Sequence, residues 1–340
     1  MLPTLDASFA QSFLAEQGII QESTPIELTT LGGGVSNRVL MAETPSSCFV
    51  LKQPRANLAV EDDWPADVAR VHNEASATRA YRSILENTST VSVPAVLAEC
   101  EQTHVVCFEC APAEARSWKQ TLLDGAVDPA IAETLGRAIG VVHDAARGEE
   151  SLRSAFTNQR PFEQLRLSPY HRTVAERHPA VASAINQEIE RIERVQETLV
   201  HGDYSPKNVL VTPAYPAESS VWVLDFEVAH WGDPAFDVAF MLNHLFIKSV
   251  YLPTAMKSFH DAARAFWNGY TDTGFAREDH VLRELGILLL ARVDGKSPVE
   301  YVTDPSMKDQ LRSIATESIT TDLETIDAFA SLVAVEVGQS

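Results

Sequence analysis

The stretch LVHGDYSPKNVLV, residues 199–211, decides the fold of this chain. Residues 199–200 and 209–211 are aliphatic and mostly β-branched, which is typical of strands. The residues between them cannot continue a strand, because Gly202 permits a sharp turn and Pro206 has no N–H for a sheet ladder. The sequence therefore predicts a tight loop between two short strands, with several polar side chains in it. Taken alone, a polar hairpin loop is the simpler interpretation, and the residues that follow reverse it.

Acidic and amide side chains recur in and after this loop. Asp203 and Asn208 are five residues apart, so a carboxylate and an amide oxygen can both reach one phosphate group. The next apolar stretch, VWVLDFE, ends with Asp225 and Glu227, which on a strand would project from the same face. Two converging carboxylates suit Mg²⁺, a hard cation that also keeps phosphate ligands. Asp237 lies in an apolar helical segment, where we expect backbone N–H groups of the loop to satisfy it.

Earlier residues supply the remaining parts of a phosphoryl-transfer site. Glycines at 32–34 separate two predicted strands, and their backbone can approach phosphates, although a plain hairpin turn explains them equally well. Lys52 lies within an apolar strand, where an ammonium group needs partners or must extend to solvent. Glu74, on the following helix, is the best-placed acid. We expect His201 to be a structural hydrogen-bonding residue and not a base.

Composition bounds the class of protein. The chain has 340 residues, 45% of them hydrophobic, and no apolar run long enough to span a membrane. Its net charge of −20 argues against nucleic-acid and anionic-membrane partners, and fits either salt adaptation or attraction of a cationic substrate. Four cysteines are few for this length, so we expect a reduced, cytoplasmic protein. The single CxxC at 107–110 has no second pair at zinc spacing.

Hydrophobic periodicity predicts an α+β, bilobal, protein-kinase-like fold. We expect a small antiparallel-sheet lobe with one helix over residues 1–111, ending in a hinge strand, and a mainly helical lobe over residues 112–340. A further helix is expected near the N-terminus, within residues 1–18. The strands are expected within residues 26–43, 48–53, 91–100 and 104–110, and the principal helices within 66–85, 128–146, 178–196, 234–250, 263–274 and 281–295.

The chain resembles the aminoglycoside phosphotransferase and choline kinase group of kinase-like enzymes. The motifs that carry this resemblance are HGDYSPKN at 201–208, LDFE at 224–227 and GDPAFDVA at 232–239. The resemblance implies that ATP and Mg²⁺ are the cofactors and that Asp203 orients the acceptor hydroxyl. Asn208, Asp225 and Glu227 would hold the metal. The residues expected to contact the nucleotide are Gly33, Gly34, Ser36, Asn37, Lys52 and Glu74, with the backbone of Glu109 and Ala111 at the adenine.

A narrower resemblance concerns methylthioribose kinases. Residues 50–75, VLKQPRANLAVEDDWPADVARVHNEA, match the segment of that family in which a strand Lys-Gln leads through Trp-Pro to an Arg-containing helix with its Glu. Arg292 falls where that family places arginines that hold the sugar. Two features depart from it: the loop has Ser-Pro-Lys-Asn at 205–208, and Ala291 stands where a paired arginine is common.

Three functions follow as hypotheses. The first is an ATP-dependent kinase of a small hydroxylated acceptor, a sugar such as methylthioribose or a related pentose. The second is an aminoglycoside or amino-alcohol kinase, which would use acids to hold ammonium groups. The third, a non-catalytic binding module, is disfavoured because every catalytic residue type is present. For the second hypothesis, the acids that could hold ammonium groups are Asp233, Asp272, Asp279 and Asp294.

Several assignments keep two interpretations. Arg292 either lines the acceptor site and favours a neutral polyol, or forms a salt bridge with Asp294 or Asp237. Lys207 either contacts a phosphate or is a surface lysine. Asp233 is also assigned to the acceptor site. A homodimer is compatible with the sequence, which does not indicate the oligomeric state.

Overall fold

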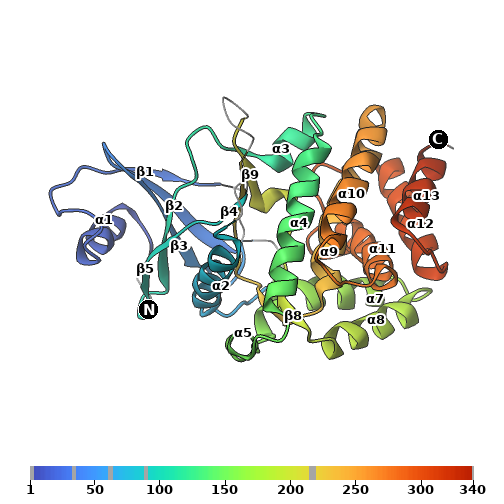
Figure 1. Ribbon diagram of the computed structural model, residues 1–340, viewed down its shortest axis with the longest axis horizontal. Helices are drawn as coiled ribbons and strands as arrows, with labels where there is room; N and C mark the ends of the chain where they lie inside the picture. Colours follow the sequence, from blue (N-terminus) through green and yellow to red (C-terminus); the bar gives the residue numbers. More distant parts are fainter. Residues whose placement is uncertain (1–3, 33–35, 60–63, 88–90, 214–219, 339–340) are drawn as a thin grey trace.

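A computed structural model describes residues 4–32, 36–59, 64–87, 91–213 and 220–338. A twisted sheet and two helices form one end of the molecule, and a set of helices forms the other (Figure 1). The predicted bilobal α+β architecture is therefore confirmed. The N-terminal sheet is antiparallel, in the order β1-β2-β3-β6-β5. Its strands are β1 Glu27–Thr30, β2 Asn37–Glu43, β3 Cys48–Pro54, β5 Val96–Cys100 and β6 Val105–Glu109.

Helices cover the two faces of this sheet. On one side, α1 (Ala7–Glu16) buries Phe13 and Leu14 against apolar residues of β2, β3 and β6. On the other side, α2 (Arg70–Leu85) packs Val71 and Ala75 against β6. Because side chains alternate along a strand, β3 presents its core residues to α1 while Lys52 projects toward α2.

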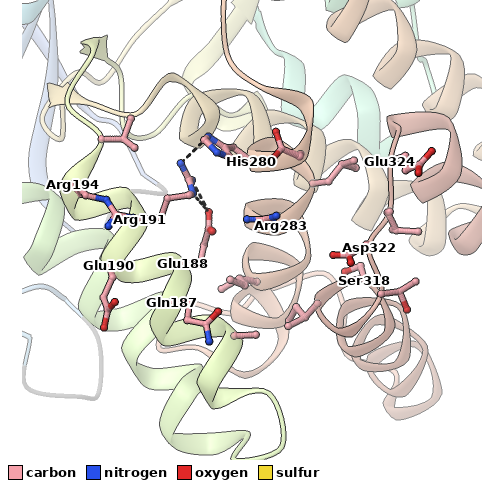
Figure 2. Close-up of a pocket in the computed structure, with 18 residues that line it drawn as sticks. Gln187, Glu188, Glu190, Arg191, Arg194, His280, Arg283, Ser318, Asp322 and Glu324 are labelled. Carbon is pink, nitrogen blue, oxygen red and sulfur yellow. Dashed lines mark hydrogen bonds and ion pairs between the residues drawn. The ribbon is translucent and has the colours of Figure 1, made fainter.

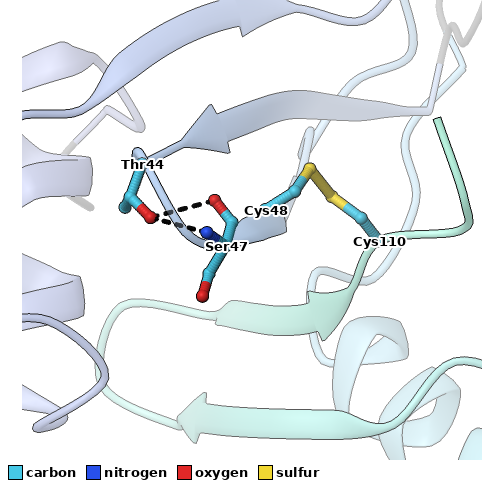
Figure 3. The surroundings of a disulfide bond; sticks show 4 residues. All are labelled: Thr44, Ser47, Cys48 and Cys110. Atoms are coloured by element: carbon cyan, nitrogen blue, oxygen red, sulfur yellow. Dashed lines mark hydrogen bonds between the residues drawn. A yellow bond between two sulfur atoms is a disulfide. The ribbon is translucent and has the colours of Figure 1, made fainter.

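A disulfide joins Cys48, the first residue of β3, to Cys110, which directly follows β6 (Figure 3). The expectation of a fully reduced protein was therefore wrong. The two residues are 62 positions apart in sequence, but β3 and β6 are paired, which brings their Cα atoms to 5.6 Å. Sequence reasoning missed this pair because the alignment of two strands is not visible in cysteine spacing. Cys107, the other cysteine of the CxxC, is buried and free.

The second lobe is built around α9 (Pro234–Tyr251), which is buried from Pro234 to Val250. Two helices beside it, α4 (Pro129–Ala146) and α10 (Met256–Thr271), approach closely because glycines lie at their contact. A Cβ at Gly136 would lie 2.0 Å from the Phe266 carbonyl oxygen, so only glycine fits there. The remaining α-helices are α3 Trp118–Leu123, α5 Glu150–Ala155, α6 Arg160–Phe162, α7 Thr173–Arg177, α8 Ala182–Arg194, α11 Glu278–Asp294, α12 Pro305–Thr320 and α13 Ile326–Gly338.

Short strands form two further sheets. Strands β4 (Val91–Ser92), β10 (Val221–Val223), β9 (Val209–Val211) and β7 (Arg116–Ser117) form one sheet, and β11 (His230–Gly232) pairs with β8 (Thr198–Val200) in the other. The predicted loop therefore joins β8 and β9, which belong to different sheets, and it is not a hairpin. Because β4 comes from the first 111 residues but pairs with β10, backbone hydrogen bonds tie the two lobes together.

An unpredicted element lies between α6 and α7. Residues Glu163–Arg172 form a π-helix that contains Pro169. Hydrophobic periodicity does not identify such a helix, and π-helical turns occur frequently at functional sites. Two 3₁₀ turns, η2 (Pro206–Asn208) and η3 (Pro253–Ala255), complete the described elements. Among the described residues, no single helix has the length and apolar character to cross a membrane.

Candidate active site

The loop after β8 is held by Asp237 of α9. One carboxylate oxygen of Asp237 accepts a hydrogen bond from the backbone N–H of His201 (2.6 Å) and the other from that of Gly202 (2.8 Å). Gly202 has φ +73°, and a Cβ there would lie 2.7 Å from the Val228 carbonyl oxygen. The predicted role of Asp237 as an acceptor for loop N–H groups agrees with this geometry.

His201 is a structural residue in this loop. Its Nε2 lies 3.1 Å from the Leu224 carbonyl oxygen, and its Nδ1 accepts a hydrogen bond from the backbone N–H of Asp203 at 3.2 Å. Burial lowers the pKa of the ring, more than the nearby carboxylates of Asp237 and Asp203 raise it. The neutral ring thus ties the loop to the segment that follows β10, as its sequence position suggested.

Asp203 is buried and surrounded by donors. Its carboxylate pairs with Arg166 Nη2 (2.7 Å) and Lys207 Nζ (2.9 Å), and accepts from Asn208 Nδ2 (2.8 Å). Burial alone would raise the pKa of Asp203, but Arg166 and Lys207 outweigh it and lower the pKa to about 2. A carboxylate with so low a pKa is a weak base. It can orient a hydroxyl group, which is what a loose phosphoryl-transfer transition state requires.

Three carboxylates meet beside this loop. One oxygen each of Glu74, Asp225 and Glu227 lie within 4.8 Å of one another. The predicted convergence of Asp225 and Glu227 is present, but the reason given for it was wrong. Strand β10 ends at Val223, and Asp225 has φ +69°, so a turn and not strand alternation brings the acids together. Aspartate is one of the few non-glycine residues that adopt this conformation readily.

Lys52 is the cation at this cluster. Its Nζ lies 2.7 Å from Glu74 and also contacts the Asp225 carboxylate. Burial opposes its charge, but Asp225, Glu74 and Glu227 outweigh that effect and raise the pKa of Lys52. The predicted pairing of Lys52 with Glu74 is therefore present, and the lysine does not extend to solvent.

The donor set fits a divalent cation. Burial, together with the charges of Asp225 and Glu227, outweighs the effect of Lys52 and raises the pKa of Glu74 to about 8. The two cations paired with these three acids, Lys52 and Arg70, leave one negative charge unbalanced, which a hard dication with oxygen ligands would offset. The side-chain NH₂ group of Asn208 donates to the backbone and the carboxylate of Asp203, so the side-chain oxygen of Asn208 is left for the same ion. Asn208, Asp225 and Glu227 would hold the metal, with Glu74 close by.

Arg70 connects Ser36 to the acid cluster of Glu74, Asp225 and Glu227. Its Nε donates to Glu227 (3.0 Å), and its Nη2 donates to the Ser36 carbonyl oxygen (2.6 Å). Asn37 donates to Glu227 as well, at 2.9 Å. Ser36 and Asn37 therefore lie beside the acids, as expected of nucleotide-binding residues. Gly33 and Gly34, also predicted to bind nucleotide, lie outside the described residues.

The predicted hinge follows β6. The Glu109 side chain accepts from the backbone N–H of Ala95 (3.0 Å) and from Arg82 (3.2 Å), so it fixes the end of the strand. In the described part of the chain, the N–H and C=O of Ala111 form no hydrogen bond. Both groups of Ala111 are thus free for a ligand such as adenine, and the neighbouring Cys110 is fixed by the disulfide.

Arg292 lies on the acceptor side of the loop. Its Nη1 donates to the Tyr170 hydroxyl (2.8 Å) and contacts the backbone and side chain of Ser297. The alternative salt bridge is not formed: Asp294 pairs with Arg312 at 2.7 Å, and Asp237 is used by the loop. The arginine lies next to the active-site residues but contacts no acid among the described residues.

Asp233, assigned to the acceptor from sequence, takes a structural place. It caps α9 by accepting from the Ala235 N–H (3.0 Å) and pairs with Arg191 of α8 at 2.5 Å. Arg191 also lines a hollow of about 1040 Å³ between α8, α11 and α12, where it contacts Glu188 and His280 (Figure 2). Of the residues predicted for the site, only Asp279, one of the candidate acids, is among the described residues that line that hollow.

Comparisons with known proteins agree with this geometry. The sequence profile of the phosphotransferase enzyme family matches residues 27–293. The chain belongs to this family. It is accordingly a small-molecule phosphotransferase, as predicted. No curated protein matches the chain significantly.

Solved structures share the fold of this phosphotransferase at low sequence identity. An ethanolamine kinase of Plasmodium vivax is 11% identical with a TM-score of 0.51, over 98% of this chain and 87% of that one. A putative aminoglycoside phosphotransferase of Ralstonia eutropha is 17% identical with a TM-score of 0.51, over 98% of each. An amicoumacin kinase, solved with AMP-PNP, Ca²⁺ and its ligand, is 14% identical with a TM-score of 0.51, over 94% and 98%.

The sequence did not single out Arg166 of the phosphotransferase. Besides its ion pair with Asp203, Arg166 donates from Nε to the Gly202 carbonyl oxygen at 2.9 Å, so it positions the whole loop. Arg166 lies on the unpredicted π-helix, 37 residues before Asp203. The sequence carries little signal for it, because Arg166 stands between two leucines in a segment, EQLRLSPYHR, that is otherwise mostly polar.

Proposed function

We propose that the protein is an ATP-dependent kinase that phosphorylates a hydroxyl group of a small, sugar-like acceptor. The observation that carries this proposal is the position of Asp203. Its carboxylate is held ionised by Arg166 and Lys207 and accepts a hydrogen bond from Asn208, whose backbone carbonyl accepts from the N–H of Leu224, the residue before Asp225. A group that orients a hydroxyl and a set that binds a metal–nucleotide complex are thus part of one site.

The described residues divide the work of phosphoryl transfer. Lys52, fixed by Glu74, is the expected partner of nucleotide phosphates. Asn208, Asp225 and Glu227 would hold Mg²⁺, which when bound neutralises phosphate charge. Asp203 accepts the hydrogen bond of the acceptor hydroxyl and so aims its oxygen at the phosphorus, while the proton leaves late in the reaction.

A sugar-like acceptor is supported by the segment shared with methylthioribose kinases. Trp64 Nε1 donates to the Gln164 carbonyl oxygen (2.8 Å), which ties this segment to the π-helix that also carries Arg166 and Tyr170. Arg292 donates to Tyr170 from the other side. A guanidinium at the acceptor position favours hydroxyl or anionic groups and repels ammonium groups.

The second candidate, an aminoglycoside or amino-alcohol kinase, has the fold neighbours in its favour but not the acids. Each of the four candidate acids is already paired with a different arginine. The pairs are Asp233–Arg191, Asp272–Arg137, Asp279–Arg277 and Asp294–Arg312. They lie on different helix ends, so they do not form a common anionic site for a polycation.

The test is a screen of the purified protein with ATP and Mg²⁺, reading ADP release. The acceptors are methylthioribose, free pentoses, sugar acids, sugar phosphates, choline, ethanolamine and kanamycin. We expect transfer to sugar-like molecules, and loss of it in Asp203→Asn. Equal transfer by Asp203→Asn, or no transfer to any of these acceptors, would contradict the proposal. Transfer to amines alone would support the second candidate.

A further inference from the structure

Two buried cations of the second lobe have no carboxylate ion-paired with them among the described residues. We call Lys248 of α9 and Arg292 of α11 the acceptor-side cations. Burying a charge without a partner of opposite sign is costly, and such residues are rare in proteins unless they have a function. The mechanism of nucleotide binding described above uses neither of them.

Lys248 is fully buried. Its Nζ has two weak contacts, with the His244 carbonyl oxygen (3.3 Å) and the Tyr301 hydroxyl (3.4 Å), and it lies 5.2 Å from the centre of the Tyr301 ring. Among the described residues no carboxylate forms an ion pair with it. An ammonium group has three donors, and these long contacts do not satisfy them.

Arg292 is similarly incomplete. Its Nη1 contacts Tyr170 and Ser297, but its Nε is buried and has no hydrogen-bond partner. Its guanidinium carbon lies 5.5 Å from the centre of the Tyr170 ring. Both cations thus rest on aromatic rings and neutral oxygens, each with donor capacity unused.

Nearby charges add to the positive field. Burial, then Lys119 and Arg292, lower the pKa of Lys248 to about 7, and Glu300 offsets this only in part. Glu300 is itself paired with Lys119, and its side chain is 66% exposed. The region therefore has an excess of positive charge that the described residues do not neutralise.

Arg292 is connected to the catalytic loop through Tyr170, and Lys248 lies near enough to Arg292 for the charge of the arginine to lower the pKa of the lysine. The Tyr170 hydroxyl accepts from Arg292 at 2.8 Å, and its ring lies 5.6 Å from the guanidinium of Arg166, which pairs with Asp203. Lys207 extends from the same loop.

We propose that Lys248 and Arg292 bind an oxyanion of the acceptor, so that the substrate is a hydroxylated carboxylate or phosphate ester. This inference rests on the proposed kinase function and specifies the acceptor class. A carboxylate or phosphate accepts several charge-assisted hydrogen bonds at once, which matches the unused donors of both residues. A neutral pentose would leave the charges unbalanced, and an ammonium group would be repelled.

Binding tests the anion site directly. With the nucleotide site saturated by ADP and Mg²⁺, calorimetry measures binding of ribonate, ribose 5-phosphate and sulfate to the wild type, Lys248→Met and Arg292→Met. We expect at least one probe to bind, and each variant to weaken it roughly 10- to 100-fold. Lys296→Met is the matched control, because Lys296 is an exposed lysine near the same site and pairs with no acid among the described residues. No binding of any probe to the wild type, or equal loss in the control, would overturn the proposal.

Turnover distinguishes the two sources of the anion and separates this proposal from the kinase function. The acceptors form matched sets: ribose, ribonate and ribose 5-phosphate, then glycerol and glycerate. We expect a lower KM for the acid or the phosphate ester than for the neutral parent, with an unchanged KM for ATP. The preferred member identifies carboxylate or phosphate. Transfer that favours neutral or amine acceptors would leave the kinase function intact and overturn the anion site. Anion binding with no transfer to any acceptor would contradict the kinase function alone.

Discussion

Two groups of charged residues near Asp203 can be compared: the acid cluster with Lys52, here called the donor side, and the region of Lys248 and Arg292, here called the acceptor side. They differ in the sign of their unbalanced charge. On the donor side, the three acids Glu74, Asp225 and Glu227 face two cations, Lys52 and Arg70, and the excess is negative. On the acceptor side, Lys248 and Arg292 have no acid partner among the described residues, and the excess is positive. Apart from Asp225, which is partly exposed, these residues are buried, so water screens their charges only weakly.

This difference shows how the missing ligands can be inferred from charge. A buried excess of one sign is stabilised by a ligand of the other sign. A metal ion bound to nucleotide would balance the negative charge of the donor side, and an anionic acceptor would balance the positive charge of the acceptor side. The donor side is the part expected of a phosphotransferase of this family, whereas the specificity of this chain would come from the proposed acceptor side.

The largest effect is expected where the two sides meet. Asp203→Asn keeps the size of the side chain but removes the charge that orients the hydroxyl. We expect kcat to fall by roughly 10²- to 10⁴-fold. Steady-state kinetics gives this value, and calorimetry with ADP and Mg²⁺ should show nucleotide affinity changed by less than about three-fold. Parallel losses of turnover and nucleotide affinity would place Asp203 on the donor side instead.

A smaller but still large effect is expected for the metal acids. Asp225→Asn should weaken Mg²⁺-dependent ADP binding by about 10- to 100-fold. Glu227→Gln should weaken it less, because the Glu227 carboxylate also accepts hydrogen bonds from Arg70 and Asn37. Titration of Mg²⁺ in the presence of ADP measures both. Unchanged metal affinity in the two variants would remove the metal from this cluster.

On the acceptor side we expect a gain in stability. At pH 7, Lys248→Met should be more stable than the wild type by about 1–4 kcal/mol, since it replaces an unpaired buried charge by an apolar side chain. Denaturant unfolding measures this difference. A loss of stability would mean that Lys248 is an ordinary structural residue.

The same variant predicts a pH dependence. Burial, Lys119 and Arg292 lower the pKa of Lys248 from 10.5 to about 7, while Glu300 opposes them and His244 beside it is kept neutral by burial. Between those values the unfolded chain binds more protons than the folded one, so this contribution makes the wild type more stable as pH rises. The advantage of Lys248→Met should therefore shrink from pH 7 to pH 10, by up to about 1.4 kcal/mol per pH unit. An advantage that stays constant across this range would contradict the lowered pKa.

The smallest effect is expected for the acids that the amine hypothesis needs. Asp294→Asn removes the partner of Arg312 and His178, which are partly exposed. We expect a loss of at most about 1 kcal/mol in unfolding free energy and no change in acceptor KM. A higher KM for choline or kanamycin in this variant would support an acidic acceptor site and contradict the positive charge assigned to the acceptor side.

The donor side could be predicted from sequence because its residues are close together in the chain or on regular elements. Asp203, Asn208, Asp225 and Glu227 lie within 25 residues, and a strand lysine with a helix glutamate is a local pattern. Even there, the geometry of Asp225 was misjudged, because a positive φ is not visible in the alternation of side chains. The antiparallel sheet and the helical lobe followed from periodicity. The strand order came only from the structure, as did the capping of α9 by Asp233, which the sequence had suggested for the acceptor site.

The acceptor side could not be predicted in the same way. It combines residues that are far apart in sequence, from the π-helix, α9 and α11. Whether an arginine is paired depends on which acids the fold brings near it, and the sequence offered Asp294 and Asp237 as partners that the structure places elsewhere. The Cys48–Cys110 bond has the same cause, since it depends on the pairing of β3 with β6.

That bond also changes the covalent topology of the first lobe. It closes the chain into a ring that contains Lys52, Glu74 and Glu109. A protease that cuts the backbone once inside this ring would therefore release no fragment, and both cut ends would remain attached to one molecule. On a denaturing gel the nicked protein would run as a single species without reductant and as two with it. The lysine of the donor side and its glutamate thus stay linked even when the chain between them is broken.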